Sequence, residues 1–580
     1  MTKTYYRFLL LLCCCWPDIS TTQPAPGASD GVAYMPEHMT IHTDRQLYIS
    51  GETIWFKVYV FDSRQGKPAD FSKAAYLELI SQKGIAISRV KVALNNGQGA
   101  GTIELPKALN NGNYVLRAYT QAMRNEGEAS FCKSMLIILN PGQPMARATD
   151  ASLVSTKPPA IVHSPGQDLL ISIQTTETTF PQRSQIGFEI TTKNAAGQPV
   201  AANLSVSIAL PSPAAIGNTG FSSPSKKETS TAPSQITYAP EPHGLRLHGK
   251  VINQNTKQGE PNATVFLALP GKAALVYGAT TDATGAFNFL LPKLYGLRQI
   301  VLQAQPQTTV PVSIELDDEF HSISDTNSAT FVLPSQWESL AQTAMVNAQI
   351  GQAYEAFETQ PTYTTHAPFA TVPFFGKPDI QYLLDDYTRF PLPEFFFEVV
   401  TEVSVKGKFG SERLEVINDW EASFKELPPL LLVDGVPVFD QNAFLKLNNK
   451  LIASTEVVTS PFWLNPVIFN GVIQISSFES NAYSFVLPET ALQRSYLTFL
   501  PERVFAVSDN SQTNPQLPDF RNTLFWSPSV QTDANGKAEI TFFTSDALGP
   551  YDIQVRGVSE TGLQGIGSSR ITIIKPVLKE

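Results

Sequence analysis

The stretch DRQLYISGETIWFKVYV, residues 44–60, is the most regular part of the chain. From residue 54 its side chains alternate between two faces, and this period of two indicates a β-strand. The first face consists of Ile54, Phe56, Val58 and Val60, and the second consists of Trp55, Lys57, Tyr59 and Phe61. We expect the first face to point into a sandwich core and the second to pack beneath a neighbouring module, with an exposed binding surface as the alternative. The strand therefore predicts a building block rather than an active site.

Composition places the chain among globular, mostly β proteins. Its length suggests about four domains, and 42% hydrophobic residues are enough for several cores. The 43 prolines and 35 glycines indicate many short strands joined by turns. Only 16% of the residues are charged and the net charge is -10, so there is no excess of basic side chains to neutralise a phosphate backbone. We therefore expect no nucleic-acid partner.

Residues 1–22 have the order of a secretory signal peptide. Lys3 and Arg7 precede nine apolar residues, 8–16, and a polar stretch with small residues follows up to Thr22. Nine residues are too few to span a bilayer, and no later apolar run approaches the length of a membrane helix. We expect an exported protein without a transmembrane segment in its mature chain. Its predicted location is the periplasm or the surface of the cell envelope, with the outer membrane as a candidate site of association.

Three of the four cysteines, residues 13–15, lie within this signal. Cleavage before one of them would allow a lipid anchor. The preceding residues are Leu or Cys, however, rather than the Gly or Ala that such processing prefers, so an ordinary cleaved signal is favoured. Cys132 is the only cysteine after the signal, which excludes an intramolecular disulfide in the mature chain. Its setting, SFCKSMLIIL, predicts a buried strand residue.

Residues 34–140 contain further strand-like runs separated by Gly, Asn and Pro turns, which predicts a β-sandwich. Two of these runs, TDRQLYISGETIWFKVYV at 43–60 and LNNGNYVLRAYT at 109–120, share a pattern with a known family. The matching positions are Asp44, Arg45, Tyr48, Gly51, Glu52, Ile54, Phe56, Gly112, Tyr114, Leu116, Arg117 and Tyr119. The segment resembles a macroglobulin-like domain of the alpha-2-macroglobulin kind, and the resemblance implies an immunoglobulin-like sandwich.

The next segment, 141–210, is a second predicted β-sandwich. Gly197 in its NAAGQPV turn permits the positive φ that a hairpin turn needs. A stretch rich in Ser, Pro, Thr and Lys begins at residue 211, so we predict an exposed linker over 211–243.

Residues 244–315 form a third predicted β unit. This unit resembles the carboxypeptidase regulatory-like domain, a transthyretin-type sandwich that carries no catalysis itself, at Gly249, Val251, Pro261, Ala263, Val265, Leu267, Thr281, Asp282, Gly285 and Phe287. The segment 316–400 is expected to be a partly helical connector. Within it, Ser335 and Glu338 are spaced as a capping box at the start of a helix.

Residues 401–490 resemble the plug domain of TonB-dependent outer-membrane receptors, a small α+β unit. The shared positions are Pro429, Val433, Asp434, Gly435, Val436, Pro437, Glu456, Val457, Val458, Gly471, Val472, Ile473 and Ile475. Such a receptor continues into a barrel of about 22 strands. Too few residues follow Ile475 in this sequence, so we expect the chain not to be the transporter. The apolar run 430–433 and Val472 then need cover from the connector before the unit or from the tail after it.

The tail, 491–580, is predicted to be a C-terminal macroglobulin-like β domain with a hairpin turn at Asn535-Gly536. The full order of units resembles a group of exported multidomain proteins from Bacteroidota. The implied partner is a protein or glycan component of the cell envelope, with an outer-membrane receptor as one candidate.

A search for reactive groups identifies no catalytic, cofactor-binding or metal-binding residue. The seven histidines form neither an HExxH helix nor a Cys/His cluster, and His38 and His42 have no third ligand nearby in the sequence. There is no GxSxG elbow, and the carboxylate pairs 317–318 and 385–386 are interpreted as solvated loop charges. The thioester of alpha-2-macroglobulins forms within Cys-Gly-Glu-Gln, whereas Lys and Ser follow Cys132.

These observations predict a non-enzymatic envelope protein that binds to or assembles with outer-membrane or periplasmic partners. The alternative is a noncovalent protease inhibitor of the alpha-2-macroglobulin type without the thioester, for which residues 211–234 are the candidate bait segment.

Overall fold

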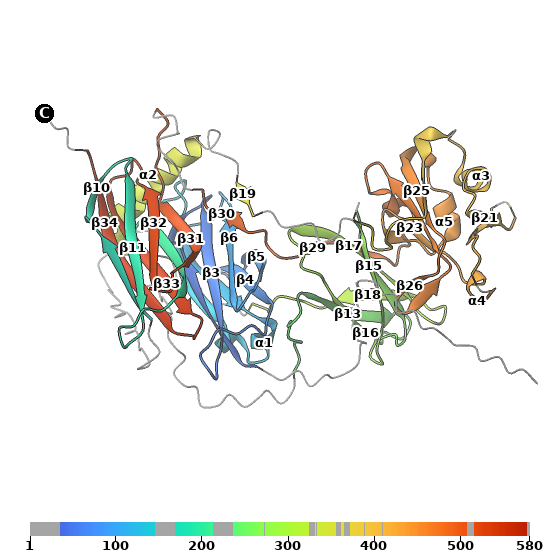
Figure 1. The fold of residues 1–580 in the computed structure, drawn as a ribbon, viewed down its shortest axis with the longest axis horizontal. Helices are drawn as coiled ribbons and strands as arrows, with labels where there is room; N and C mark the ends of the chain where they lie inside the picture. Colours follow the sequence, from blue (N-terminus) through green and yellow to red (C-terminus); the bar gives the residue numbers. More distant parts are fainter. Residues whose placement is uncertain are drawn as a thin grey trace, which may run out of the picture.

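The computed structural model describes residues 35–144, 169–212, 236–323, 331–354, 361–364, 372–506 and 516–576, apart from residues 272, 332, 388, 409 and 421. Over these residues the chain is mostly β-structure, arranged in sheets of two to five strands. Figure 1 shows two bodies: a pair of sandwiches that contains both the first and the last strands, and a second body built from the middle of the chain, coloured green to orange. Among the described helices, none has the length and apolar character needed to cross a membrane.

The first sandwich comprises residues 35–144. Its three-stranded sheet has the order β1-β3-β6, with bounds Glu37–Thr43, Thr53–Asp62 and Gln98–Glu104. Its five-stranded sheet has the order β2-β8-β7-β4-β5, with bounds Leu47–Ile49, Cys132–Leu139, Gly112–Tyr119, Ala74–Ser81 and Ala86–Ala93. The short helix α1, Gln121–Arg124, follows β7. The sandwich predicted for this segment is confirmed, and Cys132 is buried in β8 as expected.

Both faces of strand β3 are buried, as its alternating sequence predicts. Ile54, Phe56, Val58 and Val60 belong to the core of the first sandwich. On the other face, Tyr59 and Phe61 pack against Val558, and the Lys57 ammonium donates to Asn203 Oδ1 at 2.6 Å. Both Val558 and Asn203 lie in the second sandwich. The aromatic face therefore lies under a neighbouring module and is not an exposed binding surface.

The second sandwich is built from two segments that are far apart in the sequence. The earlier segment supplies β9 (Leu170–Thr175), β10 (Thr179–Pro181), β11 (Gln185–Lys193) and β12 (Ala202–Ala209). The later segment supplies β31 (Thr523–Gln531), β32 (Lys537–Phe543), β33 (Gly549–Ser559) and β34 (Gln564–Ile574). The sheets have the orders β10-β34-β33-β12-β31 and β32-β11-β9.

This arrangement corrects the prediction of separate domains at 141–210 and 491–580. Strand β12 lies between β33 and β31, so neither segment closes a sheet without the other. A strand leaves its backbone donors and acceptors unpaired on an open edge, and interleaving the two segments satisfies them. A turn is present at Asn535-Gly536, where Gly536 has φ +68°, but it joins β31 and β32, which belong to different sheets, so the predicted hairpin does not form.

A small sandwich follows in the middle of the chain. It contains β13 (Arg246–Asn253), β14 (Thr264–Leu269), β15 (Leu275–Thr280), β16 (Ala286–Leu290), β17 (Leu297–Gln305) and β18 (Val312–Leu316). The sheets have the orders β16-β13-β18 and β15-β14-β17-β29. Because β29, Leu492–Leu497, is an edge strand here, the start of the predicted C-terminal domain belongs to this sandwich instead.

The distal module comprises residues 372–490. Its central sheet has the order β20-β25-β28-β23-β24, with bounds Ile380–Leu383, Ile452–Val458, Val472–Ser477, Leu430–Val433 and Val436–Pro437. Around it lie the helices α3 (Leu392–Glu398), α4 (Ala422–Lys425) and α5 (Gln441–Leu445) and the hairpin strands β21 (Val403–Lys406), β22 (Arg413–Val416), β26 (Phe462–Leu464) and β27 (Val467–Phe469). Asp434 and Gly435 form the predicted turn after β23, with φ +51° and +80°.

The apolar surface of the distal module is covered from two sides. Phe375, Phe395 and Phe396 come from the second half of the predicted connector, which confirms the expected cover from that side. Phe266 and Val301 come from the small sandwich, which was not expected to contribute. The described part of 491–580 supplies none of the buried side chains of this core, so of the two alternatives the connector provides cover and the tail does not.

The predicted connector is divided between two bodies. Helix α2, Glu338–Tyr354, forms as expected, but a 3₁₀ turn, Ser335–Trp337, precedes it, so Ser335 lies inside that turn and does not occupy the cap position. Ala341 and Ala344 of α2 enter the core shared by the first and second sandwiches. The short strands β19 (Thr362–Tyr363) and β30 (Arg503–Val504) pair with each other. Along the chain, β19 lies between α2 and the distal module, and β30 lies between the small sandwich and β31.

Candidate functional site

The residues that carry the family resemblance in the first sandwich are mostly buried, and they form joints to other parts of the chain. Asp44 has a fully buried carboxylate that accepts hydrogen bonds from the Tyr48 hydroxyl at 2.7 Å and from the Trp55 N–H at 2.9 Å. It also accepts one from the Thr523 hydroxyl of β31 at 2.5 Å. Burial raises the pKa of Asp44, and the neighbouring Arg45 and these donors oppose the rise.

Arg45 and Glu52 complete this sandwich joint, which we define as Asp44, Arg45, Glu52, Asn522 and Thr523. Arg45 Nη2 lies 2.6 Å from Glu52 Oε2, and Arg45 Nη1 donates to Thr523 Oγ1 at 2.5 Å. Asn522 Nδ2 donates to Glu52 Oε1 at 2.7 Å. Burial lowers the pKa of Arg45, but Glu52 and Asp44 more than offset that effect, so the guanidinium stays charged. The joint thus fastens the first sandwich to the second through a paired and hydrogen-bonded cation.

A serine and a histidine also meet between the two sandwiches. His42 Nδ1 lies 2.5 Å from Ser205 Oγ, and the Tyr59 hydroxyl lies 2.8 Å from the same oxygen. Burial keeps the pKa of His42 well below its usual value, and the cations of Arg556 and Lys57 lower it further. In a catalytic pair a third group orients the histidine, but His42 Nε2 is buried without a hydrogen-bond partner in the described chain. This contact is therefore structural.

The sequence pair His38 and His42 makes no metal centre in the described part of the chain, where no group of three or more metal-binding side chains occurs. His38 instead stacks on Phe61, with ring centroids 5.0 Å apart. Burial lowers the pKa of His38 to about 4. Of the carboxylate pairs, Asp317 contacts His248 and Asp385 contacts Arg389, so the two pairs do not converge on one cleft.

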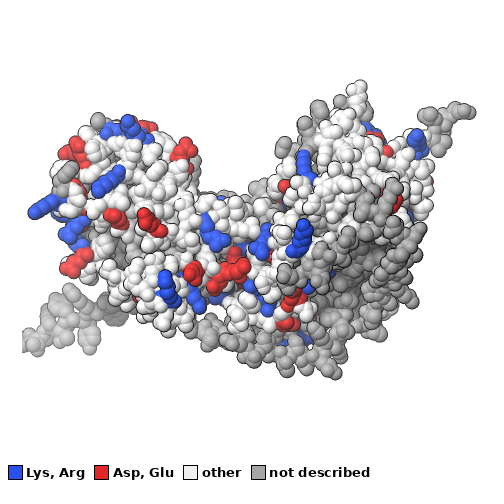
Figure 2. All heavy atoms as spheres, turned by 180° about the vertical axis from the view of Figure 1, so that it is seen from behind, with Lys and Arg blue, Asp and Glu red and all other residues white. Residues whose placement is uncertain are grey.

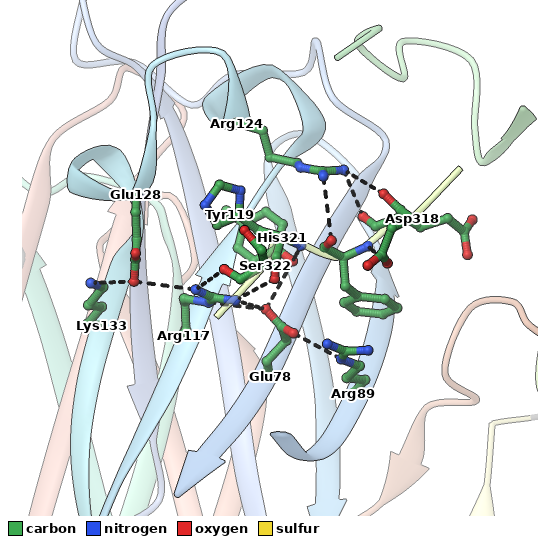
Figure 3. A network of polar contacts seen from close by, with 12 residues as sticks. Glu78, Arg89, Arg117, Tyr119, Arg124, Glu128, Lys133, Asp318, His321 and Ser322 are labelled. Atoms are coloured by element: carbon green, nitrogen blue, oxygen red, sulfur yellow. Dashed lines mark hydrogen bonds and ion pairs between the residues drawn. The ribbon is translucent and has the colours of Figure 1, made fainter. Parts of the chain in front are cut away.

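A second joint surrounds Glu78 on β4 (Figure 3). Arg117 Nη2 donates to Glu78 Oε2 at 2.6 Å, the Tyr119 hydroxyl donates to the same oxygen at 3.0 Å, and Arg89 Nε donates to Glu78 Oε1 at 3.0 Å. Arg117 and Tyr119 belong to the second stretch of the family resemblance. Glu78 is fully buried, and these three donors satisfy its charge.

The cations of this joint also hold the segment 317–323, which we call the strap, where the chain returns from the small sandwich. Arg117 Nη2 donates to the His321 carbonyl at 2.9 Å, and the Tyr119 hydroxyl accepts from the His321 N–H at 2.8 Å. Arg124 Nη1 donates to the Glu319 carbonyl at 3.0 Å. Figure 3 shows these side chains converging on the strap from the sheet and from α1.

A buried acidic cluster lies beside the strap. Lys91 Nζ lies 2.7 Å from Glu319 Oε1 and 3.1 Å from the Tyr496 hydroxyl, which also donates to Glu319. The Tyr76 hydroxyl donates to Glu241 Oε1 at 2.9 Å. Burial raises the pKa of Glu241 to about 7 and lowers that of Lys91. The cluster connects the first sandwich to three parts of the small sandwich: Glu241 precedes its first strand, Glu319 follows β18, and Tyr496 lies in its edge strand β29.

The distal module exposes many large hydrophobic side chains that the sequence reasoning missed. Of the twenty large hydrophobic side chains exposed in the described chain, ten lie between residues 372 and 490. They are Val372, Leu383, Tyr387, Phe397, Ile417, Trp420, Leu451, Trp463, Phe478 and Phe485. One signal was available: in the run EFFFEVV at 394–400, a helix that buries Phe395 and Phe396 must turn Phe397 toward solvent.

On the face shown in Figure 2, blue and red side chains are interspersed, and neither sign forms one continuous patch. That face therefore presents no continuous basic patch.

Comparison with known proteins supports the resemblance drawn from the two stretches of the first sandwich. Residues 38–132 match the MG2 domain family, and they cover almost all of the first sandwich. The chain is thus a mostly β, multi-sandwich protein with a macroglobulin-type domain near its start. No curated protein sequence matches the chain. The resemblances noted for 244–315 and 401–490 remain predictions.

Solved structures with detectable similarity include two bacterial alpha-2-macroglobulins. The Salmonella protein reacted with methylamine is 10% identical, and the alignment covers 96% of this chain and 41% of that one, with a TM-score of 0.25. The native Escherichia coli protein is 12% identical, with coverage of 97% and 41% and a TM-score of 0.25. Latent PorU from Porphyromonas gingivalis is 11% identical, with coverage of 48% and 33% and a TM-score of 0.16. Scores this low assign neither an overall fold nor an activity.

Proposed function

We propose that this protein is an exported, non-enzymatic binding protein of the cell envelope, which presents its distal module to a protein or glycan partner. The observation that carries the proposal is the concentration of exposed aromatic side chains on that module. Trp463 is 72% exposed, Phe397 71% and Phe485 69%. Aromatic residues are enriched in binding interfaces because they contribute a large contact area with few rotatable bonds.

The rest of the chain supports this role as a scaffold. The sandwich joint, helix α2 and the Glu78 joint connect segments hundreds of residues apart, so the sandwiches form a firmly packed base for the distal module. The buried Ser205 and His42 offer no reactive surface.

Site-specific photo-crosslinking in intact cells tests the proposal. A photoreactive amino acid replaces Trp463 or Phe485 in the full chain, and Leu548, which is 41% exposed on the second sandwich, is the control position. We expect a discrete adduct of higher mass from the two distal positions and none from position 548. Equal adducts at all three positions, or none at the distal ones, would contradict the proposed surface. Recovery of the mature protein from the cytoplasm would contradict export.

The MG2 match favours one alternative, noncovalent inhibition of proteases. Its candidate bait segment, 211–234, lies outside the described residues except for 211 and 212. Limited proteolysis separates the two functions. An inhibitor is cleaved within 211–234 and the protease then loses activity toward a large protein substrate, whereas a binding protein with a simple linker is cleaved and leaves the protease fully active.

A further inference from the structure

The strap, residues 317–323, is bound to the first sandwich in the way that a peptide ligand is bound. No residue of the strap is in a strand or a helix. Side chains from β7 and α1 hold its backbone instead. The carbonyls of five consecutive residues accept hydrogen bonds from three side chains: Asp318 and Phe320 from Arg124, Glu319 from Arg124 and Gln121, and His321 and Ser322 from Arg117. Capture of backbone carbonyls does not depend on the identity of the side chains that the peptide carries.

Two side chains of the strap make specific contacts with the first sandwich. The Phe320 ring is 7% exposed and packs edge-on against Tyr76, with centroids 5.4 Å apart, while the Arg89 guanidinium lies 5.0 Å from its centroid. The Glu319 carboxylate meets the Lys91 ammonium at 2.7 Å. The surface of the first sandwich that contacts the strap, which we call the groove, therefore holds a carboxylate followed directly by a phenylalanine.

The groove is held in shape by contacts within the first sandwich. Glu78 positions both Arg117 and Arg89. Gln121 Oε1 accepts from Arg124 Nη1 at 2.8 Å. Because the donors are fixed by their own domain, the groove is preorganised, which reduces the conformational entropy lost on binding.

We propose that this groove is a peptide-binding site for segments that contain an acidic residue followed by phenylalanine, and that the strap occupies it as an intramolecular ligand. The external ligand is a segment of a partner protein in which an acidic residue is followed by phenylalanine. The tethered strap competes at an effective concentration on the order of millimolar. The intact chain therefore binds such a peptide weakly, and the site becomes available when the strap is displaced.

Fluorescence anisotropy with a labelled peptide of residues 316–323, LDDEFHSI, tests the proposal on the full chain. The variant Phe320→Ala removes the ring that packs against Tyr76. The variant Glu319→Gln weakens the binding of the strap to Lys91 but keeps the Phe320 ring. We expect each variant to bind the peptide at least tenfold more tightly than the unaltered chain does. The control peptide LDDEAHSI should bind at least tenfold more weakly than LDDEFHSI.

Circular dichroism and thermal unfolding establish that each variant is folded, and Glu319→Gln serves if Phe320→Ala is not. Adding Arg124→Ala to the opened variant removes donors from the groove and should abolish the gain. The inference is overturned if the folded variants bind no more tightly than the unaltered chain, if both peptides bind equally, or if Arg124→Ala leaves the gain intact. In each of those cases the strap is only a structural joint.

Discussion

The Thr523 hydroxyl donates a 2.5 Å hydrogen bond to the Asp44 carboxylate, although the two residues are 479 positions apart in the sequence. Asp44 stands at the start of the stretch that resembles a macroglobulin-like domain, and Thr523 begins a strand of the second sandwich. The contact explains why a short, polar stretch lies in a buried place: it joins two domains. Polar groups in such a position stabilise the structure only when each has a partner.

Thr523→Val should destabilise the base of the protein. Valine has nearly the same shape but no hydroxyl, so Asp44 loses a donor and Arg45 loses an acceptor in a buried setting. A loss of about 1–3 kcal/mol in the free energy of unfolding is expected, measured by denaturant titration. Thr523→Ser keeps the hydroxyl and should stay close to the unaltered chain. Equal losses for the two variants would show that the hydroxyl contributes nothing.

Glu78→Gln should be among the most damaging single substitutions in the first sandwich. It leaves the buried guanidinium of Arg117 with only the Glu128 carboxylate, 3.3 Å from Arg117 Nη1, and removing one partner of a buried pair costs about 3–5 kcal/mol. The control is the pair Arg570 and Asp552, 2.5 Å apart, in which the guanidinium is exposed. Arg570→Gln should change the free energy of unfolding by less than about 1 kcal/mol. If the two substitutions have similar effects, the Glu78 network is not the joint described above.

Stability should depend on the ionisation of Glu241 between pH 4.5 and about 7. Burial raises its pKa from 4.5 to about 7 in the folded protein, while the Tyr76 hydroxyl, the Arg246 N–H and Lys91 oppose the rise and Glu319 adds to it. Since the folded pKa lies above the unfolded one, this contribution to stability is complete below pH 4.5 and is lost as the pH rises through 7. The loss is on the order of 3 kcal/mol.

The variant Glu241→Gln isolates that dependence, because glutamine resembles the protonated acid and does not titrate. The difference in unfolding free energy between the variant and the unaltered chain should grow in favour of the variant as the pH rises from 4.5 to 7. A constant difference across this window would show that Glu241 titrates normally.

Phe266→Ala tests the cover that the small sandwich supplies to the distal module. Phe266 is almost fully buried and lies 4.9 Å from Phe439 of the distal module, centroid to centroid. Its removal leaves a cavity, with an expected loss of about 3–5 kcal/mol, and should increase the binding of a hydrophobic dye. Phe266→Leu, which keeps most of the apolar volume, should lose much less. A folded Phe266→Ala variant with unchanged stability and dye binding would show that the distal module needs no such cover.

The strand content and the faces of individual strands were predictable from the sequence. The alternation in β3 and the continuous apolar run of β23 are local patterns, in which the hydrophobicity of each residue indicates whether its side chain is buried. The turn at Asp434-Gly435 was equally local, because few residue pairs adopt positive φ at both positions. In the same way, the run of three phenylalanines at 395–397 contained enough information to predict one exposed ring, although that inference was not drawn.

By itself, the sequence indicated strands such as β3 and β23, the buried faces of these strands, and a macroglobulin-type stretch that includes Asp44. Only the tertiary structure decided which strands pair, and hence that β12 lies between β31 and β33 in a single sandwich rather than in two. The physical reason is that an apolar face and a row of backbone hydrogen-bonding groups are satisfied equally well by many strands. The choice among them depends on the packing of the whole chain. For the same reason Arg117 and Tyr119 could be recognised as a family pattern, whereas their partner, the strap, became visible only once the chain had folded back over the first sandwich.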